Sequence, residues 1–134
     1  MLADMNPQQR EAVRYLDGPL LVLAGAGSGK TRVITRKIAY LVNECGHEAR
    51  HIAAITFTNK AAREMQERAG SLLEGRAGKG LTVSTFHSLG LAILRHDARR
   101  IGYKPQFSVL DAADAQKIVS DIVKATDKQT LRRA

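Results

Sequence analysis

The eight residues from Ala24 to Thr31, Ala-Gly-Ala-Gly-Ser-Gly-Lys-Thr, constrain this chain more than any other segment. Their glycines free the backbone, so that several N–H groups can converge on one anion without obstruction by a Cβ atom. The apolar run Leu20–Ala24 leads into the segment, and an amphipathic pattern follows it. A strand, a glycine-rich turn and a helix in this order are typical of a P-loop, which predicts a site for a nucleoside triphosphate.

Each residue type in the loop has a predicted task. Lys30 is expected to reach the β- and γ-phosphates, and the hydroxyl of Thr31 to ligate Mg²⁺. The phosphate cradle is expected to consist of Ala24, Gly25, Ala26, Gly27, Ser28 and Gly29. The strict pattern begins with glycine, whereas this segment begins with Ala24. A glycine turn with a purely structural role is the alternative, and the strand and helix patterns on either side favour nucleotide binding.

The order of apolar runs predicts a helix followed by three strand–helix units. The expected strands are Leu20–Ala24, Ile52–Phe57 and Leu81–Phe86. Such an alternation predicts an α/β fold with a parallel sheet and right-handed crossovers. Because ligands bind beyond the carboxyl ends of parallel strands, we expect the chemistry at the loops that follow Ala24, Phe57 and Phe86.

Helix boundaries and inward faces are predicted from caps and periodicity. The first helix is expected from the Asn6 cap and Pro7 up to Gly18-Pro19, with Ala12, Val13 and Leu16 inward. The helix after the loop should bury Val33, Ile34, Ile38, Leu41 and Val42, and the next, capped by Thr58 or Asn59, should bury Ala61, Ala62, Met65 and Ala69. Two more helices are expected, over Ser88–Arg100 and from Asp111, with Asp114 completing a capping box.

The charge balance suggests a polyanionic partner. Lys and Arg number 21 against 13 acidic residues in 134, a formal net charge of +8. Nucleic acid is the leading candidate, and a merely basic, soluble surface is the alternative. A single cysteine excludes an intrachain disulfide and a zinc cluster. Without an apolar signal core or a membrane-spanning run, the chain is expected in the cytoplasm.

Four segments in this order carry a resemblance to a known family: Asn6–Val13, Leu23–Val33, Ile55–Met65 and Ser84–His87. The chain resembles the amino-terminal part of a superfamily 1 DNA helicase of the UvrD/Rep/PcrA group, and within that group the Rep type. The resemblance extends to about Leu110, and Ala at the first P-loop position is common in the group. It implies a RecA-like P-loop NTPase fold, present here in part, that uses ATP and Mg²⁺.

Further nucleotide contacts come with the resemblance. Gln9 matches the glutamine that recognises the adenine edge, a task that suits a carboxamide because it offers one donor and one acceptor. Arg32 matches the arginine that stacks on adenine, which suits a planar guanidinium. Without the resemblance, a solvated helix position is the favoured interpretation of Gln9, and a surface position near a helix start is the alternative for Arg32.

Two motifs are similar to those that contact single-stranded DNA in this group. The first comprises Thr56, Phe57, Thr58, Asn59 and Lys60, and the second comprises Thr85, Phe86 and His87. An aromatic ring at a strand end can stack on any base, while a helix N-terminus can hold a backbone phosphate. Periodicity alone leaves Phe57 compatible with a core position. The expected partners are therefore single-stranded DNA and its junctions with duplex, with no membrane.

Hydrolysis requires groups that the chain lacks. Family members carry an adjacent Asp-Glu pair after a hydrophobic strand, and no two acidic residues are adjacent here. The resemblance also implies that residues 1–88 form the first part of the ATP-binding domain (1A), and that residues 89–134 begin an inserted helical subdomain (1B). The expectation is an amino-terminal fragment of a 3′-to-5′ helicase; the alternatives are a stand-alone P-loop nucleic-acid-binding protein and, less favoured, a small-molecule kinase.

Overall fold

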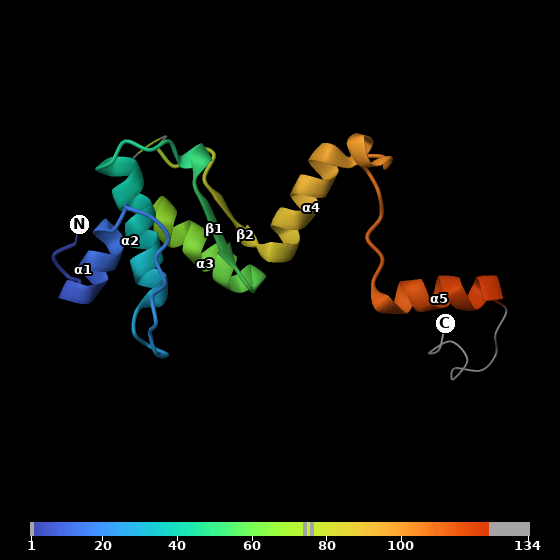
Figure 1. The fold of residues 1–134 in the computed structure, drawn as a ribbon, viewed down its shortest axis with the longest axis horizontal. Coiled ribbons are helices and arrows are strands. Elements are labelled where there is room, and N and C mark those ends of the chain that lie inside the picture. Colours follow the sequence, from blue (N-terminus) through green and yellow to red (C-terminus); the bar gives the residue numbers. More distant parts are fainter. Residues whose placement is uncertain (1, 74, 76, 124–134) are drawn as a thin grey trace. The chain divides into compact units, whose positions relative to one another are not determined.

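The computed structural model describes residues 2–73, 75 and 77–123 (Figure 1). The chain divides into two compact units, residues 1–91 and 92–134. The division falls inside helix α4 (Phe86–Asp97), a few residues after the boundary expected at position 88. Residues 124–134 of the expected second domain lie outside the described part. No helix among the described residues is long and apolar enough to cross a membrane.

Helix α1 (Pro7–Arg14) begins as the sequence predicts. The Asn6 side chain accepts a hydrogen bond from the Gln9 N–H at 2.8 Å, and the Gln9 carboxamide oxygen accepts one from the Asn6 N–H at 3.1 Å. The predicted end at Gly18-Pro19 is wrong, because Tyr15 is already extended. Leu16 consequently lies outside the helix and is exposed. The Ala12 carbonyl, which the Leu16 N–H would bond in a longer helix, accepts a hydrogen bond from the Lys37 ammonium instead.

The predicted strand Leu20–Ala24 is not formed. No strand in the described part of the chain pairs with it, so the sheet has two strands where three were expected. A strand exists through hydrogen bonds to a neighbour, and an apolar run cannot supply that neighbour itself. Leu21 and Leu23 are 81% and 87% exposed, whereas Leu20 and Val22 lie half-covered against the helices.

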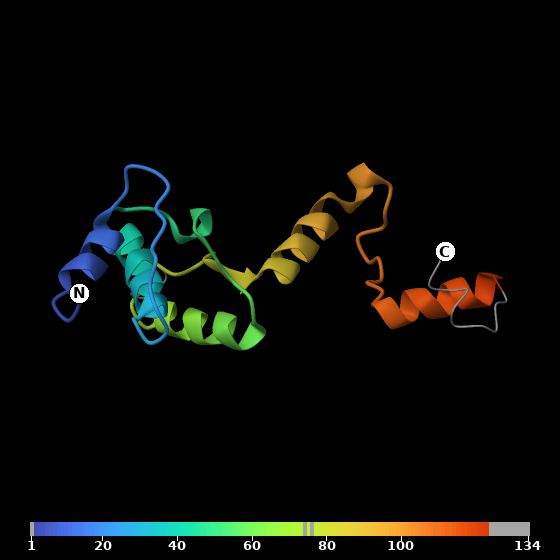
Figure 2. The same ribbon diagram turned by 60° about the horizontal axis from the view of Figure 1, so that its bottom comes forward.

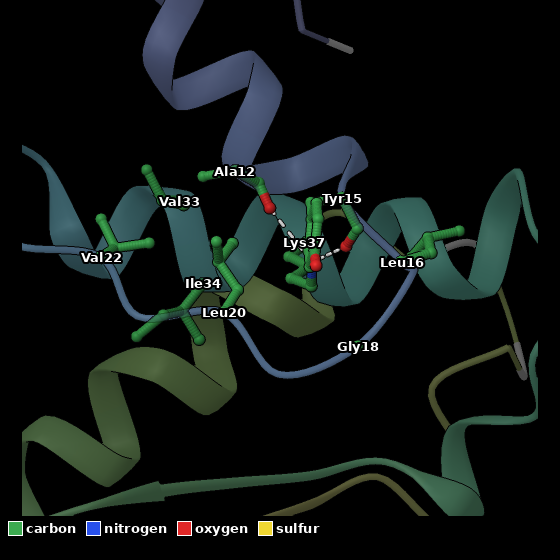
Figure 3. Close-up of a pocket in the computed structure, with 9 residues that line it drawn as sticks. All are labelled: Ala12, Tyr15, Leu16, Gly18, Leu20, Val22, Val33, Ile34 and Lys37. Atoms are coloured by element: carbon green, nitrogen blue, oxygen red, sulfur yellow. Dashed lines mark hydrogen bonds between the residues drawn. The ribbon is translucent and has the colours of Figure 1, made fainter.

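Helix α2 (Lys30–Asn43) starts directly after the glycine-rich loop. Ile38 and Ala39 are buried on its inner face, and Val33, Leu41 and Val42 are partly buried, as expected for four of the five predicted positions. The prediction for Ile34 is wrong, since 41% of it is exposed. Ile34 points toward Leu20 in a hollow that no paired strand covers, as Figure 3 shows.

The sheet consists of β1 (Ala53–Thr56) and β2 (Thr82–Thr85), which run parallel with Ala53 opposite Thr82 and Thr56 opposite Thr85. A short 3-10 helix, Ala49–His51, precedes β1. Both strands lie within their predicted ranges. Helix α3 (Asn59–Gly70), capped by the Thr58 side chain, packs against them. The core contains the side chains of Ile38, Ala39, Ala54, Met65, Ala69 and Leu73.

Burial in the sheet is lower than the sequence suggests. Of the β1 residues only Ala54 is buried, and of the β2 residues only Thr85. Parallel sheets are normally covered by helices on both faces, and α3 is the helix that packs against both strands here. In Figures 1 and 2 the strands lie alongside α3.

The two remaining helices were both predicted from the sequence, but their observed bounds differ from the predicted ones. Helix α4 begins at Phe86, two residues before the predicted start, and a 3-10 turn over Ala98–Ile101 takes the place of its predicted last turn. Gly102 ends that turn with φ of 81°. Helix α5 (Ala112–Val123) follows Asp111, whose carboxylate accepts the Asp114 N–H at 2.8 Å, as the predicted capping box requires.

Candidate nucleotide and nucleic-acid site

The glycine-rich loop adopts backbone conformations that favour glycine. Gly27 and Gly29 have φ of 75° and 83°, a region that side chains with a Cβ atom rarely enter. The Ser28 N–H donates to the Gly25 carbonyl at 3.3 Å and closes a turn between them. A Cβ atom at Gly25 or Gly27 would meet nothing within 4 Å. The loop therefore faces open space, as a cradle for an anion must.

Positive charge is concentrated at the loop. Lys30 Nζ donates to the carbonyl oxygens of Ala24 and Gly25 at 3.0 and 2.7 Å, and in the described part of the chain it forms no ion pair with a carboxylate. Gly29 offers no side-chain cap to the N-terminus of α2, so the first N–H groups of the helix keep their partial positive charge. An ammonium group and an uncapped helix start are both suited to a phosphate.

The metal position is less complete. Thr31 lies in the first turn of α2 and is partly exposed. No group of three His, Cys, Asp or Glu side chains that could hold a metal occurs among the described residues. Magnesium commonly keeps several waters and binds through few protein ligands together with the phosphates. The Thr31 hydroxyl is suited to act as a single protein ligand of this kind.

Gln9 lies on the P-loop. Its carboxamide nitrogen donates to the Ser28 carbonyl at 3.0 Å, while its oxygen accepts the Asn6 N–H at 3.1 Å. A Cβ atom at Gly29 would come within 3.1 Å of the same nitrogen. The structure thus brings Gln9 to the loop over 19 residues of sequence. Each end of the carboxamide makes one of these bonds, which leaves a second N–H and a second oxygen lone pair for a ligand.

Arg32 forms an ion pair with Asp4, which Arg36 joins at 3.2 Å. The hydrogen bond from Arg32, with the charges of both guanidinium groups, holds the pKa of Asp4 below its usual value. Sequence reasoning missed Asp4, since no motif marks an acidic residue 28 positions before its partner. Arg32, in the first turn of α2 directly after the loop, is therefore held beside the segment that precedes α1.

A small hollow of about 160 Å³ lies between Gln9 and the P-loop. Its lining comes from the start of α1, the segment before the loop, the loop itself and α2, and it includes Asn6, Gln8, Gln9, Leu23, Ser28 and Lys30. Its volume is below the several hundred cubic ångströms of a typical small-molecule pocket. It therefore fits part of a nucleotide beside the phosphate cradle.

A second group of predicted residues meets at the carboxyl edge of the sheet. Thr56 and Thr85 are opposite each other in register, so Phe57 and Phe86 follow the two strands side by side. Their ring centroids are 5.5 Å apart, and the side chains are 87% and 58% exposed. The core position that periodicity allowed for Phe57 is therefore excluded. Exposed rings of this size are suited to stacking on a planar ligand.

The other residues of the two motifs have different surroundings. Thr58 caps α3 by accepting the Ala61 N–H at 3.1 Å, and Asn59 and Lys60 lie exposed in its first turn. His87 is exposed in the first turn of α4. Thr85 is buried, and its hydroxyl donates to the Ser88 hydroxyl at 3.0 Å. Thr85 therefore supports the start of α4 from inside and offers no exposed side chain.

Beside this edge lies an open hollow of about 380 Å³ between α3 and β2. Its lining combines amide, hydroxyl and guanidinium groups from Asn59, Arg63, Gln66, Ser84, Thr85 and Ser88. The sequence did not predict Gln66 and Ser88 as site residues, because neither belongs to a recognisable motif. The edge thus places two exposed rings next to a groove of mixed polar and apolar lining that includes the Arg63 guanidinium.

Comparison with known proteins agrees with this combination of a P-loop and a strand edge with exposed aromatics. Residues 5–134 match the family described as "UvrD/REP helicase N-terminal domain". The chain belongs to this family. The family description names helicases, and the relatives described next are named ATP-dependent DNA helicases.

Individual relatives are named helicases. The chain is 54% identical over 118 residues to the ATP-dependent DNA helicase Rep of Escherichia coli (strain K12), covering 88% of this chain and 18% of the relative. It is 53% identical over 124 residues to the ATP-dependent DNA helicase PcrA of Bacillus subtilis (strain 168), covering 92% of this chain and 17% of the relative. The chain thus spans less than one fifth of the length of these helicases.

Proposed function

We propose that this chain supplies the ATP-binding and single-strand-binding motifs of an ATP-dependent DNA helicase that moves 3′ to 5′ along single-stranded DNA. Residues 1–88 would form the first part of its RecA-like domain, and residues 89–134 the start of a helical subdomain. The observation that carries the proposal is a P-loop whose Lys30 lacks a carboxylate partner among the described residues, in the same compact unit as a strand edge with two exposed rings.

ATP would be held chiefly by the loop. Backbone N–H groups over Ala24–Gly29 would cradle the phosphates, and Lys30 would exchange its carbonyl partners for phosphate oxygens. Gln9 would recognise adenine with its second N–H and second oxygen lone pair, and Arg32 would stack on the base after releasing Asp4. Thr31 would ligate Mg²⁺, which would neutralise phosphate charge.

Single-stranded DNA, including its junctions with duplex, would bind at the sheet edge. Phe57 and Phe86 would stack on bases without sequence preference, because every base has a π-face. The exposed Lys60 and the N-terminus of α3 would hold the backbone. His87 would add a contact at the start of α4, and the hydroxyl of Thr85 would serve as an internal support. A net charge of +8 favours the association.

The test of the nucleotide site is Lys30→Ala. The variant should lose most of its affinity for ATP, a loss of about 1.5–3 kcal/mol, since a charge-assisted hydrogen bond to the phosphates disappears. Affinity is measured on the 134-residue chain by titration with a fluorescent ATP analogue. Lys79→Ala, which removes an exposed lysine from the loop before β2, is the matched control. Equal affinity of the two variants would refute the P-loop assignment.

A further inference from the structure

Lys37 is a basic residue of α2 whose side chain ends on another helix. Its ammonium donates to the Ala12 carbonyl at 3.0 Å and to the Tyr15 carbonyl at 2.6 Å, across 25 and 22 residues of sequence. Figure 3 shows both contacts, with Lys37 rising from α2 to the end of α1. The carbonyl of Ala12 is one of the last in α1, and that of Tyr15 belongs to the residue that caps it.

These carbonyls attract a cation for a physical reason. The last carbonyl groups of a helix lack partners within it and carry partial negative charge. Lys37 is partly buried, and desolvation lowers its pKa below the usual value. In the described part of the chain no carboxylate forms an ion pair with it. The two carbonyls are therefore what fixes its position.

The opposite end of α1 is held by the same helix. Asp4, shortly before α1, pairs with Arg32 and Arg36 of α2. Three basic residues of α2 thus hold the α1 segment before its first turn and after its last. Between these two points lies Gln9, whose carboxamide nitrogen is 3.0 Å from the Ser28 carbonyl of the P-loop.

We propose that Lys37 is a positioning residue for nucleotide recognition: by binding the C-terminal carbonyls of α1 it fixes the helix that places Gln9 against the P-loop. The inference rests on the proposed ATP site and adds to it a residue outside every motif. Lys37 does not line the hollow between Gln9 and the P-loop, and its ammonium lies on the Ala12 and Tyr15 carbonyls instead. Its effect is therefore expected on the choice of base, with the phosphate cradle left intact.

The experiment compares Lys37→Met with Lys37→Arg in the 134-residue chain. Methionine keeps an unbranched stem for packing and removes the donor, whereas arginine keeps a cation that reaches the carbonyls. Binding of ATP, GTP and inorganic tripolyphosphate is measured by competition against a fluorescent ATP analogue. In Lys37→Met the preference for ATP over GTP should fall about tenfold, with tripolyphosphate affinity retained, and Lys37→Arg should restore the preference.

A double-mutant cycle with Gln9→Ala separates positioning from general destabilisation. If Lys37 acts through Gln9, Lys37→Met should cause no further loss of base preference in the Gln9→Ala background. If Lys37→Met only reduced the amount of folded protein, binding of all three ligands would fall equally. Circular dichroism measures the folded fraction. If Lys37→Met does not fold, Lys37→Gln, whose side chain is a shorter donor, replaces it.

The outcomes are distinct for the two proposals. Wild-type chain without affinity for ATP and tripolyphosphate would refute the proposed nucleotide site, and the role of Lys37 with it. Wild-type chain that prefers ATP, loses the preference in Gln9→Ala and keeps it in Lys37→Met would overturn the role of Lys37 alone. Fully additive losses in the double mutant would overturn it as well.

Discussion

Phe57 has surroundings that its residue type seldom has. Large aromatic side chains are usually mostly buried, yet this ring is 87% exposed and has the partly exposed ring of Phe86 as its neighbour. Keeping such apolar area in contact with water costs folding free energy. We infer that the ring is retained there for a ligand, which makes its removal informative.

At this scale, Phe57→Ala should weaken the binding of single-stranded DNA by about 1–3 kcal/mol, the contribution of one stacked base. Fluorescence anisotropy of a labelled oligothymidylate, titrated at fixed salt, measures the change. Tyr103→Ala removes another exposed ring, one outside both motifs, and should leave the affinity unchanged. Equal effects of the two variants would contradict the role of Phe57 in stacking.

The carboxylate of Asp4 offers a test of the pair that holds Arg32. Its pKa is lowered first by the hydrogen bond from Arg32, so Arg32→Ala should raise it toward 3.8. Because the folded-state pKa is depressed, the pair stabilises the fold at neutral pH, and this contribution disappears as pH falls through that pKa. A carboxyl ¹³C NMR titration follows the group.

The control for that titration is Arg14→Ala, which removes an exposed basic side chain from the last turn of α1. It should leave the titration of Asp4 as in the wild-type chain. A curve for Arg32→Ala that coincides with the wild-type curve would show that the ion pair does not persist in solution.

At the scale of elements, the junction between the loop and α2 depends on Gly29. Its φ of 83° is strained for any residue with a Cβ atom, and that atom would lie 3.1 Å from the carboxamide nitrogen of Gln9. Gly29→Ala should therefore lower the free energy of unfolding by about 1–3 kcal/mol. Urea denaturation measures it.

Gly25→Ala is the matched control for Gly29→Ala. Its φ is not in the left-handed region, and a Cβ atom there meets nothing within 4 Å, so its unfolding midpoint should stay near that of the wild-type chain. Comparable losses at the two positions would mean that the loop tolerates no side chain for reasons other than the conformation of Gly29.

Two elements show how context overrides pattern. Leu20–Ala24 has the composition of a buried strand, but without a pairing partner in the described part of the chain it stays unpaired, with Leu21 and Leu23 in solvent. Ile34 of α2 was expected to pack against that strand, and it is exposed for the same reason. By contrast, Met65 and Ala69 are buried as predicted, because β1 and β2 are present for α3 to cover.

At the scale of the whole molecule, the chain should bind ATP without hydrolysing it appreciably. No two acidic residues are adjacent in its sequence, and the family resemblance leads us to expect the carboxylates that hold the metal and position water as an adjacent Asp-Glu pair. Phosphate release is measured with saturating ATP, Mg²⁺ and single-stranded DNA, against Lys30→Ala as the blank. Turnover clearly above that blank would overturn this account.

Nucleotide binding without turnover also fits a stand-alone P-loop protein, and a longer protein with an Asp-Glu pair would exclude that alternative.

The sequence by itself determined the local features of this protein. The Asn6 cap, the glycine-rich turn before α2, the Thr58 cap and the Asp111–Asp114 box follow from residues a few positions apart. Local hydrogen bonds and backbone preferences need no distant partner, so a sequence can state them fully. The motifs of the family could likewise be recognised from the sequence, because each is defined by residue types at fixed spacing.

The contacts between residues that are distant in the sequence could be known only from the folded structure. It placed Gln9 on Ser28, Asp4 on Arg32 and Lys37 on the end of α1, contacts that join residues 19 to 28 positions apart. It also buried Thr85, exposed Phe57, and left Leu20–Ala24 without a partner strand among the described residues. The physical reason is common to all of these: burial and long-range pairing depend on the partner surface that the rest of the fold presents, and the residue itself does not encode that surface.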